Sequence, residues 1–324
     1  MASFHITVSD SVFPNLDPAR QVLATIGAEL RMADSPTPEG IVAAAAASDA
    51  LLVTYAKITA DMISKMPKCR IISRFGIGVD NVDIEAATGA GIVVTKVPDY
   101  CIDEVSDHAM ALLLAIVRKV PSSSARTHSG RWEMKAVVPI HRLRGSVLGL
   151  AGFGRIPQLV APKAKAFGMK VVAYDPFVPD DAFSRAGVER VDLPALLASS
   201  DYISVHTPLT AETKHLFNRD TFGRMKRGAY IVNTARGPII DEAALAEALD
   251  SGQIAGAALD VMSQEPPPPS PLFERDNVII TPHTSFYSEE SLVELQMKAA
   301  QEVVAVLSGK SPRNPVNPEA LAHR

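Results

Sequence analysis

The sequence predicts an α/β protein with two doubly wound parallel sheets joined by long helices. Short runs rich in β-branched residues alternate with alanine-rich amphipathic stretches along the chain. The runs are almost continuously apolar, which is typical of parallel strands covered by helices on both faces. The pattern occurs before residue 100 and again after residue 145. The chain, with 324 residues and 47% hydrophobic content, is long enough for two domains with separate cores.

Each expected strand is a short apolar run bounded by polar or turn residues. The segment PARQVLATIG, at 18–27, lies between the first two expected strands, FHITVSD and DALLVTY. We expect it to form a helix because parallel strands need crossover connections. The first sheet is expected from FHITVSD (4–10), DALLVTY (49–55), CRIISRF (69–75) and GIVVTKV (91–97). The second is expected from SVLGLAG (146–152), KVVAYDP (170–176), DYISVHT (201–207), GAYIVNT (228–234), IAGAALD (254–260) and NVIITPH (277–283).

Two longer segments are expected to be the helices that join the sheets. In DEVSDHAMALLLAIVRK, at 103–119, apolar residues cover most of a helix face, and Pro121 with a polar stretch follows. A second helix is expected from Ser288 to Leu307. If it returns to the first sheet, residues 1–100 and 288–324 form one discontinuous domain and residues 101–287 form the other. We expect no further regulatory domain after it.

Composition and charge exclude several classes of function. The chain has 32 basic and 36 acidic residues and a net charge of -4, with no basic block of the kind that follows a nucleic-acid backbone. Its longest apolar run, Ala109 to Val117, is too short to span a membrane, and the N-terminal residues lack a signal-peptide pattern. Cys69 and Cys101 form no metal-binding or disulfide motif. We expect a cytoplasmic protein that binds no nucleic acid, membrane or metal.

The turn after the first strand of the second sheet carries a nucleotide-binding pattern. VLGLA leads into Gly152 and Gly154, Arg155 and Ile156 open the next helix, and the following strand ends at Asp175. Glycines let the backbone approach a pyrophosphate, which the N–H groups and dipole of the helix attract. A carboxylate at the end of the second strand binds ribose hydroxyls and repels a 2′-phosphate. The pattern therefore predicts NAD rather than NADP.

Proline occupies position 157, where the pattern has its third glycine. If Gly154 caps the helix, Pro157 lies in the first turn, where no intrahelical hydrogen bond is lost. Pro162 lies deeper, and we expect it to remove the bond to Gln158 and to kink the helix. Two interpretations follow: a bent turn that still binds the cofactor, or a turn with weakened or lost binding.

Three segments at the ends of the last strands supply residues with acid, base and anion-binding chemistry. NTARGPIID contains Arg236, LDVMSQEP contains Glu265, and TPHTS contains His283. A histidine beside a carboxylate can give a proton to a carbonyl oxygen or remove it in the reverse direction. An arginine offers a planar pair of donors that holds a carboxylate and polarises the adjacent carbonyl.

With these segments the chain resembles the D-isomer-specific 2-hydroxyacid dehydrogenases, from about residue 40 to residue 316. Further motifs of that family follow in order: RFGIGVDNVD (74–83), DEVSDHAMALLL (103–114), HTPLTAETKHLFN (206–218) and LDV (259–261). TPHTSFYSEES is most similar to the branch that contains the C-terminal-binding proteins. RFGIGVDNVD and HTPLTAETKHL resemble phosphoglycerate dehydrogenases equally well.

The resemblance implies a flavodoxin-like substrate domain, a Rossmann NAD-binding domain and a homodimer that pairs through the latter. It implies that Arg236 anchors the substrate, His283 is the acid/base and Glu265 is its partner. It implies further that N–H groups of residues 76–78 hold the substrate carboxylate, as in an anion nest. The substrate loop consists of Gly76, Ile77 and Gly78. The cofactor set comprises His206, Thr207, Pro208, Thr234, Ala235 and, near the nicotinamide amide, Asp260.

The implied activity is an NAD-dependent 2-hydroxyacid dehydrogenase, working as a 2-oxoacid reductase with hydride transfer between nicotinamide and substrate C2. One alternative is a phosphoglycerate dehydrogenase in which Arg74 meets a phosphate, although a surface salt bridge would explain Arg74 equally well. Another is an NAD-sensing regulator without turnover. His108, on the apolar helix, is expected to pack between the domains rather than to act as a base.

Overall fold

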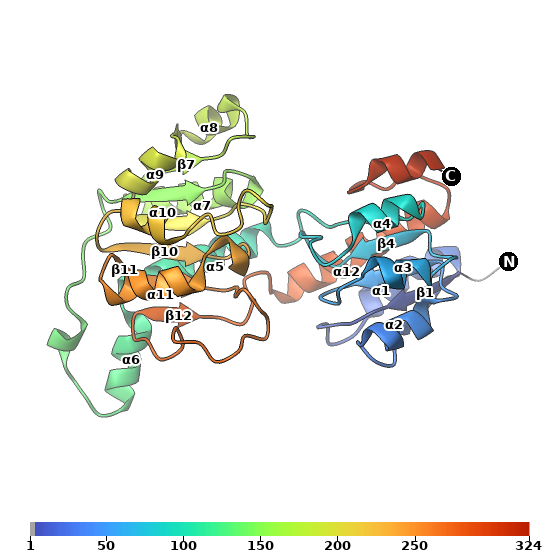
Figure 1. Ribbon diagram of the computed structural model, residues 1–324, viewed down its shortest axis with the longest axis horizontal. Coiled ribbons are helices and arrows are strands. Elements are labelled where there is room, and N and C mark those ends of the chain that lie inside the picture. Colours follow the sequence, from blue (N-terminus) through green and yellow to red (C-terminus); the bar gives the residue numbers. More distant parts are fainter. Residues whose placement is uncertain (1–3, 324) are drawn as a thin grey trace. The chain divides into compact units, whose positions relative to one another are not determined.

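The chain folds into two compact units, which we describe separately (Figure 1). The computed structural model describes residues 4–323. One unit comprises Met1–Tyr100 and Ser288–Arg324, and the other comprises Cys101–Tyr287. Each unit contains one sheet in which every strand pair is parallel. The predicted α/β class with two parallel sheets is therefore confirmed.

The first unit has a five-stranded sheet in the order β2-β1-β3-β4-β5, which is the flavodoxin-like order. The sequence patterns missed β2, because only one of its four residues is buried and it lacks an apolar run. The strands are β1 (His5–Val8), β2 (Glu29–Met32), β3 (Ala50–Val53), β4 (Ile71–Arg74) and β5 (Val93–Thr95). The short helices are α1 (Asp17–Leu23), η1 (Ala24–Ile26), α2 (Pro38–Ala45), α3 (Ala60–Ser64) and α4 (Ile84–Gly89).

The long helix α12 (Glu289–Leu307) and the segment after it belong to this first unit. The Ser288 side chain caps the helix by accepting from the Ser291 N–H, and Ser73 of β4 donates to the Ala299 carbonyl at 3.1 Å. The last segment ends in η4 (Pro318–His323), and the buried side chain of Asn317 accepts from the Val94 N–H of β5 at 2.7 Å. The helix and the tail therefore contact the sheet formed by the N-terminal part of the chain, although they come last in the sequence.

The second unit has a seven-stranded sheet in the order β12-β11-β10-β9-β6-β7-β8. This is the Rossmann order 3-2-1-4-5-6 with one further strand at the end. The two-residue β8, which is exposed, was not expected from the sequence. The strands are β6 (Val147–Ala151), β7 (Lys170–Tyr174), β8 (Glu189–Arg190), β9 (Tyr202–Val205), β10 (Ala229–Asn233), β11 (Ile254–Leu259) and β12 (Val278–Ile280).

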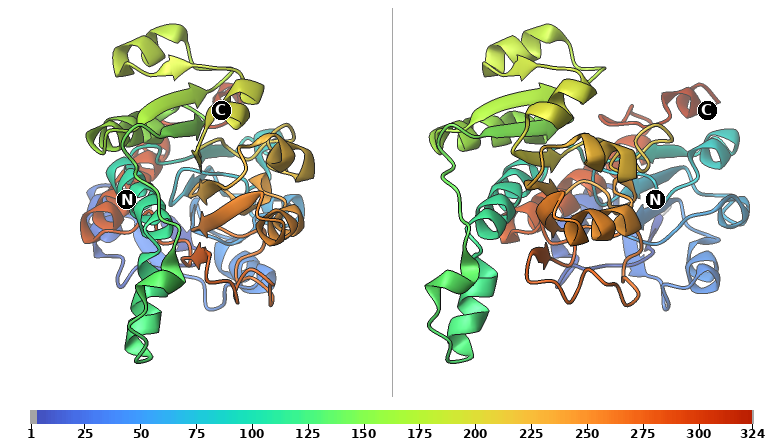
Figure 2. Two further views of the ribbon diagram at one scale, coloured as in Figure 1. Left: turned by 90° about the vertical axis from the view of Figure 1, so that its left-hand side faces the viewer. Right: turned by 60° about the vertical axis from the view of Figure 1, so that its left-hand side comes forward.

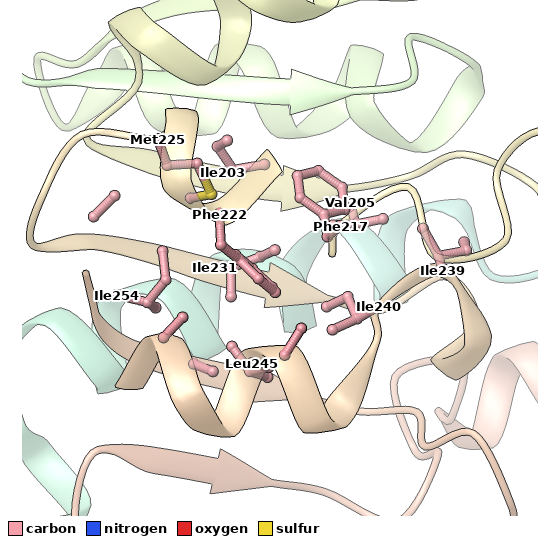
Figure 3. Packing of buried hydrophobic residues seen from close by; sticks show 14 of the residues in the cluster. Ile203, Val205, Phe217, Phe222, Met225, Ile231, Ile239, Ile240, Leu245 and Ile254 are labelled. Carbon is pink, nitrogen blue, oxygen red and sulfur yellow. The ribbon is translucent and has the colours of Figure 1, made fainter. Parts of the chain in front are cut away.

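Helices cover both faces of this sheet because successive side chains of a strand point in opposite directions. Ile231 of β10 packs into the cluster of Figure 3, where it lies near Phe222 and Leu245, whereas the adjacent Val232 belongs to the cluster with α5 and α7. The helices are α5 (Ile102–Val117), α6 (Val120–His128), η2 (Met134–Val137), α7 (Arg155–Ala166), α8 (Asp180–Ala186), α9 (Leu193–Ser199), α10 (Arg219–Arg224), η3 (Gly237–Ile239) and α11 (Glu242–Asp250).

The polar stretch after Pro121 is helical, which the sequence patterns did not indicate. It forms α6, with Pro121 in the first turn, where the backbone N–H that proline lacks would have no partner within the helix. No residue of α6 is buried. Figure 2 shows α6 and the segment that follows extending away from the sheet of their own unit.

Helix α7 contains both prolines of the nucleotide turn. Gly154 is its N-cap, as expected, so that Pro157 is its third residue, and the proline is buried. Pro162 lies inside the helix, which continues to Ala166. Both prolines are therefore accommodated within one helix.

Candidate active site

Most predicted site residues follow strands of the second unit. Carboxyl ends of parallel strands lie along one edge of a sheet, where ligands bind in this architecture. The set is Gly152, Gly154, Arg155 and Ile156 after β6, Asp175 after β7, His206, Thr207 and Pro208 after β9, Thr234, Ala235 and Arg236 after β10, Asp260 and Glu265 after β11, and His283 after β12.

The glycine turn has the backbone geometry that close approach of a ligand requires. Gly152 has φ +99°, and a Cβ there would lie 2.8 Å from the backbone C and O of His206. A Cβ on Gly154 would meet no atom within 4 Å, so the space beside the start of α7 is open. Gly154 has no side chain to cap the helix, and the N–H groups of the first turn need other partners. Together these features suit a phosphate-bearing ligand.

Asp175 connects this turn to the end of β7. One carboxylate oxygen accepts from the Phe153 N–H at 2.8 Å. The other accepts from the N–H groups of Phe177 and Val178, at 2.9 and 3.1 Å. The sequence indicated Asp175 only as a ribose ligand. The structure shows in addition that its carboxylate fixes the residue between the two glycines.

Two buried hydroxyls at this edge of the sheet have no hydrogen-bond partner among the described residues. They belong to Thr207 and Thr234, which are 7% and 8% exposed. A buried polar group without a partner is unfavourable, and such groups are rare in native proteins. Because both follow strands at the ligand-binding edge, we expect polar atoms of a bound molecule to satisfy them. The residues present therefore fit a dinucleotide.

His206 lies beneath the glycine turn as a neutral imidazole. Burial lowers the pKa of His206 to about 3. Its Nε2 is 2.8 Å from the Ser204 hydroxyl. This ring therefore cannot act as an acid near neutral pH, and it serves as an uncharged part of the turn's support.

We predict that His206 weakens the fold in acid. Below pH 6.5 the unfolded chain protonates this residue while the folded chain does not until about pH 3, so stability falls as the pH decreases. The loss is at most about 1.4 kcal/mol per pH unit. Thermal denaturation of His206→Gln should show a smaller decrease in Tm between pH 7 and pH 5 than the wild type. His128→Gln, an exposed control, should retain the wild-type decrease; equal decreases in all three proteins would contradict the prediction.

His283 and Glu265 form a close pair. Nδ1 of His283 is 2.6 Å from one carboxylate oxygen of Glu265. The other oxygen accepts from the Met262 N–H at 3.0 Å, which fixes the carboxylate. The side chains are 23% and 34% exposed. Since Glu265 takes Nδ1, Nε2 is the ring nitrogen suited to exchange a proton with a substrate.

The backbone of His283 is in the left-handed region, with φ +53°. A non-glycine residue adopts this conformation only where the surroundings impose it. The carbonyl of Asp260 accepts from the His283 N–H at 2.8 Å. Its carboxylate, in a residue only 1% exposed, accepts from the N–H groups of Thr284 and Ser285, both at 2.9 Å. Asp260 therefore organises the turn that presents His283.

Arg236 follows β10 in a turn supported by Asn233. Asn233 is fully buried, accepts from the Ala235 N–H at 2.9 Å and donates to the Arg236 carbonyl at 2.9 Å. The Arg236 guanidinium donates to the Ala235 carbonyl at 2.7 Å. Asn233 was not among the predicted site residues, although a polar residue at the end of a buried strand was a signal for it.

His108 makes a polar contact within the second unit. Nε2 of His108 is 3.1 Å from the Thr281 hydroxyl and 3.6 Å from a carboxylate oxygen of Asp260. That His108 packs between the domains rather than acting as a base stays a prediction; the structure adds that its ring takes part in a polar network with Thr281 and Asp260.

Arg74, Gly76, Ile77 and Gly78 belong to the first unit. Arg74 ends β4 and is only 9% exposed, so its side chain does not lie at the surface, as the salt-bridge interpretation had placed it. Its guanidinium donates to the Phe75 carbonyl at 2.7 Å. A Cβ on Gly76, which has φ +153°, would lie 1.0 Å from Nη1 of Arg74. Position 76 therefore requires glycine.

Neither a metal-binding cluster nor a membrane-spanning helix is found among the residues that the structure describes. Among residues 4–323, no three His, Cys, Asp or Glu side chains gather in a way that could hold a metal ion. Within the same range, no helix has the length and hydropathy needed to cross a membrane.

Comparison with known proteins shows one consistent similarity. Residues 110–285 match the family described as D-isomer specific 2-hydroxyacid dehydrogenase, NAD binding domain. A D-3-phosphoglycerate dehydrogenase of Methanocaldococcus jannaschii is 41% identical over 306 residues, which are 94% of this chain and 58% of that protein. The chain thus spans little more than half the length of this relative.

Solved structures show the same similarity in three dimensions. A protein from Thermus thermophilus is 35% identical, with a TM-score of 0.86, covering 97% of this chain and all of that one. A D-lactate dehydrogenase from Aquifex aeolicus, complexed with NAD and lactic acid, is 30% identical with a TM-score of 0.83. In that case 94% of this chain and 96% of the other are covered.

Proposed function

The chain belongs to the D-isomer specific 2-hydroxyacid dehydrogenase family, and from this premise we propose that it is an NAD-dependent 2-oxoacid reductase. The observation that carries the proposal is the pair of His283 and Glu265, with 2.6 Å between Nδ1 and the carboxylate. The unit of Cys101–Tyr287 is then the NAD-binding domain, and the unit of Met1–Tyr100 with Ser288–Arg324 is the substrate-binding domain.

NAD is the cofactor that the family implies, and the residues at the edge of the second sheet suit it. When bound, it supplies or accepts a hydride at the nicotinamide ring. Gly152, Gly154 and the first turn of α7 would hold the pyrophosphate, with Arg155 and Ile156 in that turn. Asp175 would accept from the ribose hydroxyls. The remaining members of the set are His206, Thr207, Pro208, Thr234, Ala235 and Asp260.

The chemistry of the chain's own residues is proton transfer and anion binding. Nε2 of His283 donates a proton to the carbonyl oxygen of a 2-oxo acid, and Glu265 stabilises the imidazolium that this donation requires. Arg236 holds the substrate carboxylate and polarises the adjacent carbonyl. The N–H groups of residues 76–78 offer a second set of donors for an anion. The reverse reaction uses the same groups, with His283 removing the proton.

Calorimetric titration with NADH and with NADPH tests the proposal. We expect micromolar binding of NADH and binding of NADPH that is weaker by about tenfold or more, equivalent to about 1.4 kcal/mol, because Asp175 repels a 2′-phosphate. Asp175→Ala should reduce this discrimination and weaken NADH binding as well, since the carboxylate also holds the Phe153 N–H. If neither nucleotide binds, the prolines of α7 have closed the turn and the reductase proposal fails.

Phosphoglycerate dehydrogenase is a second candidate, because the relative from M. jannaschii carries that name. In this case Arg74 would meet the substrate phosphate. Arg74→Ala should then strongly lower activity on 3-phosphoglycerate and affect an unphosphorylated 2-hydroxy acid little. Equal losses on both substrates would assign Arg74 to the support of Gly76, which its guanidinium contacts closely.

Pairing of two copies is also part of the proposal, and an exposed arm supports it. We define the arm as residues 118–144. It exposes 88% of Trp132 and 73% of Met134, residue types that are enriched in interfaces. It contains seven lysines and arginines and one acidic residue, Glu133, so its charge is +6, whereas the rest of the chain has -10. The arm is thus opposite in charge to the remaining residues of a second copy. A cytoplasmic location stays a prediction.

Sedimentation velocity tests the role of the arm. We expect the wild type to sediment as a dimer and Trp132→Glu to sediment as a monomer, because a buried carboxylate without a partner is strongly unfavourable. Phe177→Glu replaces an aromatic side chain that is 91% exposed outside the arm. It should leave the dimer intact. A monomeric wild type, or a Trp132→Glu dimer, would contradict the arm as the pairing surface.

A further inference from the structure

A chain of polar contacts connects helix α5 to the buried carboxylate of Asp260. Nε2 of His108 lies 3.1 Å from the hydroxyl oxygen of Thr281. That hydroxyl lies 2.5 Å from a carboxylate oxygen of Asp260. All three residues belong to the second unit, and α5 packs against β10, β11 and β12. The network therefore links a helix of the core to the strand ends that carry the site.

The chemistry of the three side chains determines which group donates and which accepts in each hydrogen bond of this network. A threonine hydroxyl has a single hydrogen, and at 2.5 Å from a carboxylate that hydrogen is donated to Asp260. The Thr281 oxygen can then only accept from the imidazole of His108. His108 must therefore carry a hydrogen on Nε2, and its ring acts as a donor in the network.

Asp260 in turn determines the backbone at His283. Its carbonyl accepts from the His283 N–H at 2.8 Å, and its carboxylate accepts from Thr284 and Ser285 N–H groups. The left-handed conformation of His283 is unfavourable for a residue with a side chain and persists only where several contacts impose it. The bonds from the Thr284 and Ser285 N–H groups depend on a fixed orientation of the Asp260 carboxylate, which Thr281 and His108 hold from the side of the core.

We propose that His108 is a positioning residue for the acid/base His283, acting through Thr281 and Asp260. The inference rests on the proposed function, because it treats His283 as the proton donor. His108 exchanges no proton with the substrate. Its donor hydrogen keeps the carboxylate of Asp260 oriented, so that the turn of residues 281–285 places Nδ1 of His283 against Glu265 and Nε2 where a carbonyl can meet it.

The inference is tested with pairs of variants that separate hydrogen bonding from packing. His108→Leu removes the donor and keeps apolar volume, whereas His108→Gln returns an N–H near the position of Nε2. Thr281→Val breaks the network at its middle, and Thr281→Ser retains the hydroxyl. Asp107→Asn is the control, because Asp107 is the neighbour of His108 on α5 and its ion pair with Lys163 is on the surface.

Three measurements are made on each variant: kcat and KM for a 2-oxo acid, the Kd for NADH, and a crystal structure. For His108→Leu and Thr281→Val we expect kcat to decrease by about tenfold to a hundredfold, as for a displacement of about 1 Å at a catalytic group. The Kd for NADH should change by less than about fivefold: Asp260 belongs to the proposed cofactor set, but the glycine turn after β6 is separated by three strands from β12, which Thr281 follows. His108→Gln, Thr281→Ser and Asp107→Asn should remain within about threefold of the wild type.

The crystal structures provide a measurement that does not depend on activity. In His108→Leu we expect the distance between Nδ1 of His283 and the Glu265 carboxylate to exceed its present 2.6 Å, with the sheet unchanged. An unchanged distance and an unchanged kcat would overturn the inference. So would a loss in His108→Gln as large as that in His108→Leu, which would assign His108 to packing. If the wild type reduces no 2-oxo acid, the proposed function fails, while the distance still decides whether His108 positions His283.

Discussion

Replacement of His283 with glutamine is expected to lower kcat for 2-oxoacid reduction by about 10³-fold, within the range that a positioned general acid contributes. Glutamine can still donate a hydrogen bond to the carbonyl but cannot transfer a proton at neutral pH. The Kd for NADH, measured by calorimetry, should remain within about threefold of the wild type, because the glycine turn and Asp175 do not contact this side chain. Steady-state kinetics with NADH absorbance is the measurement.

Two further variants, one at the partner carboxylate and one at an exposed histidine, are compared with His283→Gln. Glu265→Gln retains a hydrogen-bond acceptor for Nδ1 but removes the charge that stabilises the imidazolium, and we expect a loss of about tenfold to a hundredfold. His5→Gln replaces a histidine whose side chain is 51% exposed and should leave kcat unchanged. Turnover by His283→Gln at the wild-type rate would show that another group donates the proton. A wild type that binds NADH without any turnover would favour the NAD-sensing regulator.

Replacement of Arg236 with glutamine is expected to lower kcat/KM by about 10²- to 10³-fold, equivalent to about 3–4 kcal/mol. Among the described residues of the second unit that we propose to bind the substrate, Arg236 is the only one with a planar cationic side chain. Its turn is held by the buried Asn233, so the side chain starts from a fixed position. Most of the loss should be seen in KM, because the carboxylate is bound before the carbonyl reacts.

A conservative variant separates charge from geometry at this position. Arg236→Lys retains the positive charge and lacks the planar pair of donors, so we expect it to recover only part of the activity. Arg224→Gln, on the surface of α10 with a side chain 58% exposed, is the control and should have wild-type kinetics. If Arg236→Gln changes KM by less than about threefold, well below the effect of a lost charge pair, the substrate carboxylate is held elsewhere.

Much of the architecture followed from local patterns in the sequence. Every predicted strand is present, because apolar runs between turn residues are what a parallel sheet covered by helices requires. Strands β2 and β8 were missed for the opposite reason: both are largely exposed edge strands without an apolar run. Helix α6 was missed because its residues are polar and none is buried, which leaves no periodic apolar pattern to detect.

The membership of the family, and the types of residue at the strand ends, were also predictable from the sequence. The resemblance stated from motifs such as NTARGPIID and TPHTS is confirmed by the match of residues 110–285 to the family. Glycine at 152 is determined by backbone geometry, so its role was visible in the turn pattern itself. The prolines at 157 and 162 were equally visible, and what they do to the affinity for NAD stays a question for titration.

The chemical groups at the ends of the strands can be read from the amino-acid sequence, since strand periodicity and turn chemistry are local properties of the chain. The partners of those groups became known from the folded structure alone. His108 meets Thr281 across 173 residues of sequence, and Asp175 reaches the Phe153 N–H across 22. Such pairs depend on the order of the strands and on the packing of α5 against the sheet, which bring distant residues together. No spacing in the sequence encodes these contacts.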